Sequence, residues 1–262
     1  MADIDNEVLG QLNAGLDETV NLMEWLAVDM QALSCTVFSD PAFGHFGCAV
    51  LERIPVLNSL GVTKRLAAIG AAIADTIPDQ NDRNFRVLAH HRSDIVRQWA
   101  AYSINAFPGM SLQERLESVK KFATDRNMSV RECAWMAFRP HLVAELDEGL
   151  RYLQSWVIDS NPNVRRFAIE VTRPRSVWGK HIPTLKHDPG RAVALLEPVK
   201  ADKNPYVRTA VANWLNDASK TRPDWVLFIC DAWSNSDDPA TQWIIRRALR
   251  SQRALNNVPI QQ

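Results

Sequence analysis

A short pattern that occurs four times constrains the fold of this chain more than any other feature of its sequence. Each copy begins with Ser or Asn and carries Val-Arg three and four positions later. The copies are Ser93–Arg97, Asn127–Arg131, Asn161–Arg165 and Asn204–Arg208. Successive arginines are 34, 34 and 43 residues apart, within the range of HEAT-type helical-hairpin units. An Asp stands two positions before each of the last three copies, at Asp125, Asp159 and Asp202.

The residues around each copy predict that it opens a helix. Ser and Asn accept hydrogen bonds from the free N–H groups of a first helical turn, and proline fits the first helical position, as at Pro162 and Pro205. Apolar residues then follow at helical spacing, for example Val164, Phe167 and Val171. A helix with one apolar face must bury that face against a neighbour. The sequence therefore predicts an all-α fold, a right-handed α-solenoid of HEAT-like helical hairpin repeats.

The repeats do not cover the whole chain. We expect them in residues 86–253, where Asp238-Pro239 opens one more repeat helix. Residues 1–85 are less regular, and we expect helical hairpins there, with helices at Asp17–Met30 and Val62–Ile77. Residues 254–262 are expected to form a frayed tail. We therefore predict a single all-α domain over residues 1–262.

The charged residues are unevenly distributed, although the net charge is zero. Residues 1–50 hold eight Asp or Glu and no Lys or Arg, whereas residues 151–253 hold 17 basic and ten acidic residues. A basic second half can bind a polyanion such as nucleic acid. The two ends could equally neutralise each other within the fold, so charge alone leaves both interpretations open.

The sequence lacks the motifs of several common functional classes. Its four cysteines and six histidines show no zinc-ligand spacing, and it has no phosphate-binding Gly-rich loop, nucleophile elbow or HExxH motif. The acidic start, MADIDNEVLG, lacks the order of a signal peptide, and no apolar run approaches the ~18–20 residues of a membrane span. We therefore expect a soluble cytoplasmic protein with no metal, no cofactor and no membrane partner.

Two Arg-Pro pairs follow successive repeat helices, at Arg139-Pro140 and Arg173-Pro174. Proline lacks an N–H group and disfavours helical backbone in the residue before it. Both helices are therefore expected to end at these pairs, which would place the two arginines on the same rim.

Two carboxylates near predicted helix ends are candidates for chemistry, and each has a structural alternative. Glu170 could instead form a surface i,i+4 ion pair with Arg166. Asp217 is expected to follow the helix that begins at Asn204, where a negative charge opposes the helix dipole. Its structural alternative is to cap the next helix or to pair with Lys220.

Aromatic side chains near the carboxylates are further candidates. Trp178 lies in a basic, loop-like segment, where burial in a core is less automatic. Trp135 and Trp214 lie at helical positions, where tryptophan is more often a core residue. His181, after Gly179-Lys180, could contact a phosphate group or have a structural role.

The segment from Arg165 to Lys220 resembles the DNA alkylation repair glycosylases built from HEAT-like repeats, the AlkC/AlkD superfamily, and in particular its AlkC-like branch. The motifs TRPR-x-x-W, which ends at Trp178, and N-x-LND-x-x-K, which ends at Lys220, together carry the resemblance. The similarity is strongest over residues 127–253. It implies that a concave face binds duplex DNA and that the enzyme excises bases alkylated at ring nitrogens, such as 3-methyladenine, without deep base flipping.

The resemblance also implies roles for individual residues. Glu170 and Asp217 match the active-site carboxylates of the family, and Trp178 matches the aromatic residue beside them. An N3- or N7-alkylated purine is already cationic, so carboxylates need only stabilise the oxocarbenium-like sugar and position water, while a tryptophan face attracts the cation. Characterised AlkC-like members carry a third carboxylate where this chain has Trp135, and Glu132, one turn earlier, is a candidate substitute.

Three functions stay open at this point. The leading hypothesis is an alkylpurine DNA glycosylase, active on duplex DNA, with Glu170 and Asp217 as its carboxylates and with Trp178 and Trp135 lining the cleft. The alternatives are a non-catalytic DNA-binding protein and a protein-interaction scaffold. We expect a monomer, cytoplasmic and associated with the nucleoid when it is bound to DNA. The candidate phosphate contacts are Arg139, Arg173, Arg175, Lys180, Lys220, Arg246 and Arg247.

Overall fold

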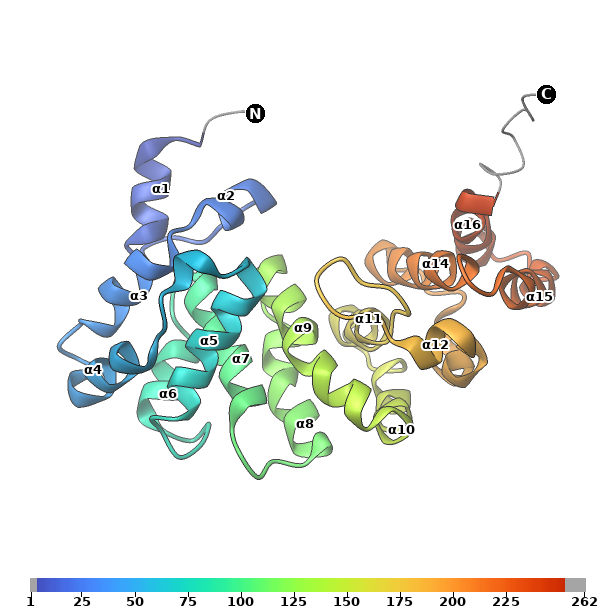
Figure 1. Ribbon diagram of the computed structural model, residues 1–262. Helices are drawn as coiled ribbons and strands as arrows, with labels where there is room; N and C mark the ends of the chain where they lie inside the picture. Colours follow the sequence, from blue (N-terminus) through green and yellow to red (C-terminus); the bar gives the residue numbers. More distant parts are fainter. Residues whose placement is uncertain (1–3, 253–262) are drawn as a thin grey trace. The chain divides into compact units, whose positions relative to one another are not determined.

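Consecutive helices joined by short turns make up the computed structural model, which describes residues 4–252 (Figure 1). No strand occurs within these residues, which confirms the predicted all-α class. The α-helices are α1 (Asn6–Asn13), α2 (Leu22–Ala27), α3 (Met30–Phe38), α4 (Gly44–Arg53), α5 (Val62–Ala74), α6 (Arg83–Ala89), α7 (Asp94–Ala106), α8 (Leu112–Ala123), α9 (Met128–Ala144), α10 (Leu146–Trp156), α11 (Pro162–Val171), α12 (Pro183–His187), α13 (Val193–Leu196), α14 (Pro205–Ser219), α15 (Pro223–Ser234) and α16 (Pro239–Ala248). Short 3-10 helices are η1 (Leu57–Ser59), η2 (Pro189–Ala192) and η3 (Glu197–Val199).

Three of the four arginines of the repeated pattern stabilise the turns that precede their repeat helices. In Arg97, Arg131 and Arg165, NH1 donates to the carbonyl groups six and five residues earlier, at 2.7–3.1 Å. Arg97 also pairs with Asp125 at 2.8 Å, and Arg165 pairs with Asp202 at 2.6 Å. Each of these aspartates precedes the next copy of the pattern. One arginine therefore holds its own turn and the turn of the following repeat.

The predicted starts of the repeat helices α11, α14 and α16 are confirmed. The side chain of Asn161 accepts a hydrogen bond from the backbone N–H of Asn163, and Asn204 accepts one from Tyr206, both at 2.9 Å. Asp238 caps α16 in the same way. In all three helices proline is the first residue, where its missing N–H group costs nothing.

The prediction of one helix over Asp17–Met30 is wrong, whereas the helix predicted from Val62 is confirmed as α5. Two capping residues divide the N-terminal segment. Asn21 accepts from the N–H of the third residue of α2, and Asp29 accepts from the first two N–H groups after Met30, at 2.9–3.0 Å. Each cap starts a new helix because its side chain satisfies N–H groups that have no partner inside that helix.

The prediction that a helix ends at Arg139-Pro140 is also wrong, because Pro140 lies inside α9. Proline within a helix costs about 3 kcal/mol. Phe138 and Leu142, on either side of it, are fully buried, and burying such a side chain contributes about 1.5–3 kcal/mol. Burial of the flanking residues therefore offsets the cost. The second Arg-Pro pair behaves as predicted, since α11 ends at Val171, two residues before Arg173.

Two compact units divide the chain between Phe138 and Arg139. In unit 1, α5 packs against α7 (Figure 1). Gly70 makes this close approach possible, because a Cβ atom at that position would lie 2.6 Å from the Cβ of Tyr102. The unit boundary lies inside the predicted repeat region, and the single-domain organisation stays a prediction.

In unit 2, α14 packs against α11, α15 and α16 (Figure 1). Trp214 of α14 is fully buried, as expected for a core residue, and its Nε1 donates to the carbonyl oxygen of Thr172 at 3.1 Å. This bond joins the interior of α14 to the C-terminal end of α11. The predicted tail, residues 254–262, lies outside the described residues.

Candidate functional site

Glu170 and Asp217 come together in unit 2 through a shared arginine. Glu170 lies in the last turn of α11, and Asp217 lies inside the last turn of α14 and not after the helix as predicted. Arg173 donates from NH1 to Glu170 Oε2 at 3.0 Å, and from Nε and NH2 to Asp217 Oδ2 at 2.9 and 2.6 Å. Both carboxylates are buried. The structure therefore joins two candidate residues that are 47 positions apart in the sequence.

Each carboxylate also faces a second cation. Arg166 NH2 lies 3.3 Å from Glu170 Oε1, and Lys220 Nζ lies 3.0 Å from Asp217 Oδ1. The ion pairs considered as structural alternatives are thus present, but they form at buried carboxylates. The cluster contains two carboxylates and three cations, so its formal charge is positive. We call these five residues the carboxylate cluster.

Electrostatics within the carboxylate cluster keep Arg173 charged. Burial by itself would lower the pKa of the Arg173 guanidinium, but Glu170 and Asp217 outweigh this effect, and the pKa lies above its ordinary value. The guanidinium of Arg166 lies 3.9 Å from the ring centroid of Tyr206, a cation–π contact that orients it. Arg166, one of the two cations that pair with Glu170, is therefore itself held in place.

Arg139, one of the predicted phosphate contacts, is bonded to the backbone beside the carboxylate cluster. It is buried, and it donates to three backbone carbonyl groups, from NH1 to Val171, from NH2 to Arg173 and from Nε to Lys180, at 2.7–3.0 Å. Burial, followed by the neighbouring Arg173 cation, lowers its pKa to about 10, so it is still charged near neutral pH. Arg139 is a positioning residue that fixes the backbone beside the carboxylate cluster.

Trp178 lies in the segment between α11 and α12, and it is half-buried. Its backbone N–H and that of Gly179 donate to the hydroxyl of Ser176 at 3.2 and 3.1 Å. The backbone N–H of Ile182 donates to the carbonyl oxygen of Pro174 at 3.0 Å. These bonds close a loop that begins directly at the carboxylate cluster, and we call residues 173–182 the site loop.

Trp135 belongs to unit 1 and is a buried residue of α9. Its Nε1 donates to Glu132 Oε2 at 2.8 Å. Glu132, the candidate substitute for a third carboxylate, is therefore engaged by Trp135 itself. The sequence predicted Trp135 as a cleft residue, and that role stays a prediction.

The other predicted phosphate contacts differ in their exposure. Lys180, Arg246 and Arg247 are exposed, and Arg175 is half-buried. Burial, followed by the charges of Lys186, Arg175 and Arg139, lowers the pKa of His181, which leaves this histidine neutral near pH 7. Lysine and arginine side chains, and not His181, thus supply the positive charge around the site loop.

The candidate phosphate contacts predicted from the sequence do not include Arg250, which follows the end of α16 by two residues. Its NH2 donates to Asn213 Oδ1 at 3.0 Å, one turn before Asp217 on α14. Burial and then Arg247 lower the pKa of Arg250, while Asp217 raises it. Its spacing of three and four positions from Arg247 and Arg246, two predicted phosphate contacts, is the feature of the sequence that could have identified Arg250.

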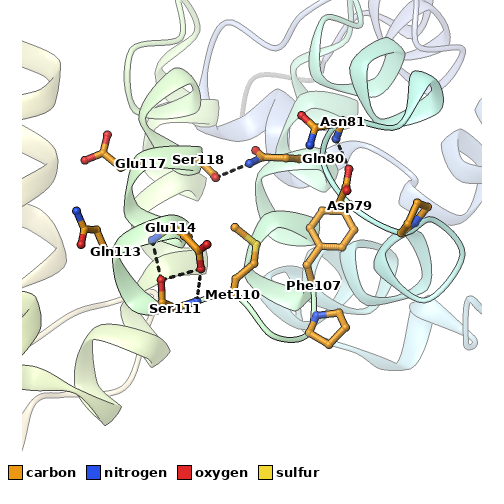
Figure 2. A pocket seen from close by; sticks show the side chains of 12 residues that line it. Asp79, Gln80, Asn81, Phe107, Met110, Ser111, Gln113, Glu114, Glu117 and Ser118 are labelled. Carbon is orange, nitrogen blue, oxygen red and sulfur yellow. Dashed lines mark hydrogen bonds between the residues drawn. The ribbon is translucent and has the colours of Figure 1, made fainter.

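A separate pocket of about 640 Å³ lies in unit 1 (Figure 2). Gln80 donates to the Ser118 hydroxyl at 2.7 Å, and the Ser111 hydroxyl donates to Glu114. Figure 2 shows both bonds. Its lining includes the carboxylates of Asp79, Glu114 and Glu117 and no Lys, Arg or His. This charge is the opposite of what a phosphate-rich ligand requires, so the candidate site for such a ligand is the carboxylate cluster of unit 2.

Within residues 4–252 no group of three or more His, Cys, Asp or Glu side chains is placed to hold a metal ion. In the same residues, no helix has both the length and the apolar character needed to cross a membrane.

Comparison with known proteins places this region in a family. Residues 138–251 match the family model described as DNA alkylation repair enzyme. These residues contain the carboxylate cluster and the site loop. An uncharacterized protein of Bacillus subtilis, YhaZ, is 34% identical over 203 residues, which are 76% of this chain and 55% of YhaZ.

Two solved structures are similar to this chain. The alkylpurine DNA glycosylase AlkC of Pseudomonas fluorescens, bound to DNA containing an abasic site analog, has a TM-score of 0.71 and 27% identity, covering 97% of this chain and 64% of AlkC. AlkD2 of Streptococcus mutans has a TM-score of 0.56 and 19% identity, covering 85% of this chain and 98% of AlkD2, and at that identity it supports the fold alone. The predicted HEAT-like architecture is confirmed. The chain spans little more than half the length of YhaZ and less than two thirds of AlkC.

Proposed function

Because the chain belongs to the AlkC/AlkD superfamily of DNA alkylation repair proteins, we propose that it is a DNA glycosylase that removes N3- or N7-alkylated purines from duplex DNA. The observation that carries the proposal is the pair of buried carboxylates, Glu170 and Asp217, joined by Arg173 inside the matched region. If duplex DNA is the substrate, the protein associates with the nucleoid when it is bound. The cytoplasmic location and the monomeric state stay predictions.

The proposed reaction breaks the bond between the sugar C1′ and the purine nitrogen. Its electron pair goes to the alkylated purine, which starts as a cation and leaves as a neutral base. Positive charge then develops on the sugar, and water adds to C1′ and loses a proton. Fixed negative charge lowers the energy of such a transition state, and Glu170 and Asp217 supply that charge, while the indole face of Trp178 can attract the cationic ring.

The cations of the carboxylate cluster need a role in this mechanism, because they oppose positive charge on the sugar. Lys220, with a side chain that is 45% exposed, and Arg173, at 23%, are accessible enough to contact a DNA phosphate. A phosphate that draws these cations toward itself would leave Glu170 and Asp217 more strongly negative toward the sugar. Each carboxylate oxygen has two lone pairs, so an oxygen with one donor, such as Asp217 Oδ1 with Lys220, can also accept a hydrogen bond from water.

Release of free base from methylated duplex DNA tests this proposal. The wild-type protein should liberate 3-methyladenine or 7-methylguanine, and a Glu170→Gln, Asp217→Asn double variant should not, while duplex binding persists or tightens. Asp231→Asn is the matched control, since Asp231 is an exposed carboxylate of α15 in the same unit. Circular dichroism of each variant verifies that the helices are retained. Base release at the wild-type rate from the double variant would exclude these carboxylates from the reaction.

A non-catalytic DNA-binding function is the second candidate. The observation in its favour is Trp135, which stands where characterised AlkC-like members carry a third carboxylate and which donates to Glu132. This function predicts salt-sensitive binding to duplex DNA with no release of base by the wild-type protein. Absence of both binding and release would leave a protein-interaction scaffold.

A further inference from the structure

The site loop presents an apolar side chain at its tip. Val177 is 88% exposed, more than any other large apolar side chain among the described residues. A valine in this position loses the stabilisation that burial of its side chain would give. Its two neighbours in the chain are the polar Ser176 and the aromatic Trp178. Contact with solvent alone therefore does not favour an apolar side chain at the tip of the loop.

Hydrogen bonds at its base hold the site loop in place. Arg139 donates to the carbonyl oxygens of Arg173 and Lys180, which lie on the two arms of the loop, at 2.7 and 3.0 Å. Gly179 permits this contact, because a Cβ atom there would lie 3.2 Å from Cδ of Arg139. The hydroxyl of Ser176, next to the tip, accepts from two backbone N–H groups. Val177 is thus an apolar residue in a loop that hydrogen bonds hold in one conformation.

The loop also starts at the candidate site. Arg173, its first residue, bridges Glu170 and Asp217, and Val177 follows four positions later, beside Trp178. A ligand in contact with the carboxylate cluster would therefore lie within reach of the loop tip.

Positive charge flanks the tip on both sides. Arg175 precedes Val177 by two positions and Lys180 follows it by three. The Nε of Arg175 is buried and has no hydrogen-bond partner among the described residues, while Lys180 is exposed. An apolar tip between cations is suited to binding duplex DNA. Cationic side chains contact the phosphates, and an apolar side chain inserted between two neighbouring base pairs unstacks them.

We propose that Val177 acts as a wedge that enters the base stack of duplex DNA next to the target nucleotide and opens it toward Glu170 and Asp217. The inference rests on duplex DNA being the ligand, as proposed above. Unstacking one base step is unfavourable, and contacts of the site loop and the carboxylate cluster with the phosphates would offset that cost. Val177 is a positioning residue, because it changes the exposure of the base and takes no part in bond breaking.

Fluorescence of 2-aminopurine tests the wedge directly, because this base becomes brighter when it is unstacked. The probe is a duplex that carries 2-aminopurine beside a tetrahydrofuran abasic site, measured at saturating protein. The wild-type protein should raise the fluorescence, and Val177→Ser should reduce that rise by about threefold or more while the duplex Kd changes by less than about threefold, which is about 0.6 kcal/mol. Val177→Ile should retain the rise. Ile158→Ser is the matched control, since Ile158 is a 71% exposed apolar residue of the same unit.

An equal fluorescence rise for wild type and Val177→Ser at saturation would overturn the wedge. Melting curves serve as a second readout, and we expect no loss of stability, because a residue this exposed contributes little to the core. The wedge and the proposed enzyme activity fail separately. A rise that depends on Val177 without base release would refute the glycosylase and keep the wedge, and base release with an unchanged rise would do the reverse. Absence of duplex binding would refute both.

Discussion

Replacement of Arg173 by methionine tests the arrangement of the carboxylate cluster most directly. We expect Arg173→Met to lower the free energy of unfolding by about 3 kcal/mol, because removing one partner of a buried ion pair costs about 3–5 kcal/mol. The side chains of Glu170 and Asp217 are only 4% and 7% exposed. The lower end of the range applies because Glu170 keeps Arg166 and Asp217 keeps Lys220 as partners.

Urea unfolding near neutral pH, followed by far-ultraviolet circular dichroism, measures this change. The midpoint should fall with little change in the dependence on urea, since the variant exposes the same surface on unfolding. Arg151→Met is the matched control. Arg151 pairs with Glu148 in the same unit, but the two side chains are 67% and 41% exposed, and solvent-exposed ion pairs contribute little. The control should therefore unfold like the wild-type protein.

A triple variant separates unpaired charge from lost packing. Glu170→Gln, Arg173→Met and Asp217→Asn together remove the cation and both negative charges at nearly constant volume. Replacing buried ionic partners by neutral groups of similar shape is often close to neutral. The triple variant leaves Arg166 and Lys220, the other two members of the carboxylate cluster, without their carboxylate partners, so the recovery is expected to be partial. We therefore expect the triple variant to recover at least half of the stability that Arg173→Met loses. If it is as unstable as the single variant, packing accounts for the loss and the electrostatic reasoning is refuted.

Three further predictions concern a histidine, a helix contact and a phosphate contact. Burial, followed by the charges of Arg97 and Arg92, lowers the pKa of His91 below 6.5. The contribution of His91 to stability is therefore complete above pH 6.5 and is lost as pH falls through the lower pKa of the folded state. His91→Asn should make the melting temperature less dependent on pH between about 5 and 7, and equal dependence in both proteins would contradict this. Gly70→Ala places a Cβ atom 2.9 Å from the backbone of α7, and in urea unfolding it should lower the free energy of unfolding by about 2 kcal/mol. Gly10→Ala is the control and should not destabilise the protein, because a Cβ atom at Gly10 would have nothing within 4 Å. Similar free energies of unfolding for the two variants would count against the close approach of α5 and α7. Lys180→Ala should reduce the slope of log Kobs against log salt by about 1 in duplex binding, with Lys200→Ala, whose lysine pairs with Glu197, as a control that keeps the slope.

The repeated pattern made the class of fold readable from the sequence. Asn161 and Asn204 act on N–H groups two residues away, and the prolines after them act on their own backbone. These interactions are local, so the residues that make them lie next to one another in the sequence. The same applies to the pairs Glu170–Arg166 and Asp217–Lys220, which their spacing along one helix is enough to suggest.

Effects that depend on distant neighbours could not be read in this way. Pro140 was expected to end a helix, but burial of the residues around it keeps α9 continuous. Asp17–Met30 was expected to be one helix, because the sequence alone did not show that two capping residues would outweigh its apolar spacing. In both cases the competing contributions are a few kcal/mol each, too close for a local pattern to decide.

The sequence by itself thus determined the all-α class, the caps at Asn161, Asn204 and Asp238, and the two candidate carboxylates with their local partners. Only the tertiary structure decided that Arg173 reaches Asp217, 44 residues away, and that Arg139 donates to three backbone carbonyl groups. The physical reason is the range of the interactions. Capping and i,i+4 contacts are set within one helical turn, whereas the partner of a long arginine side chain depends on which helices pack together.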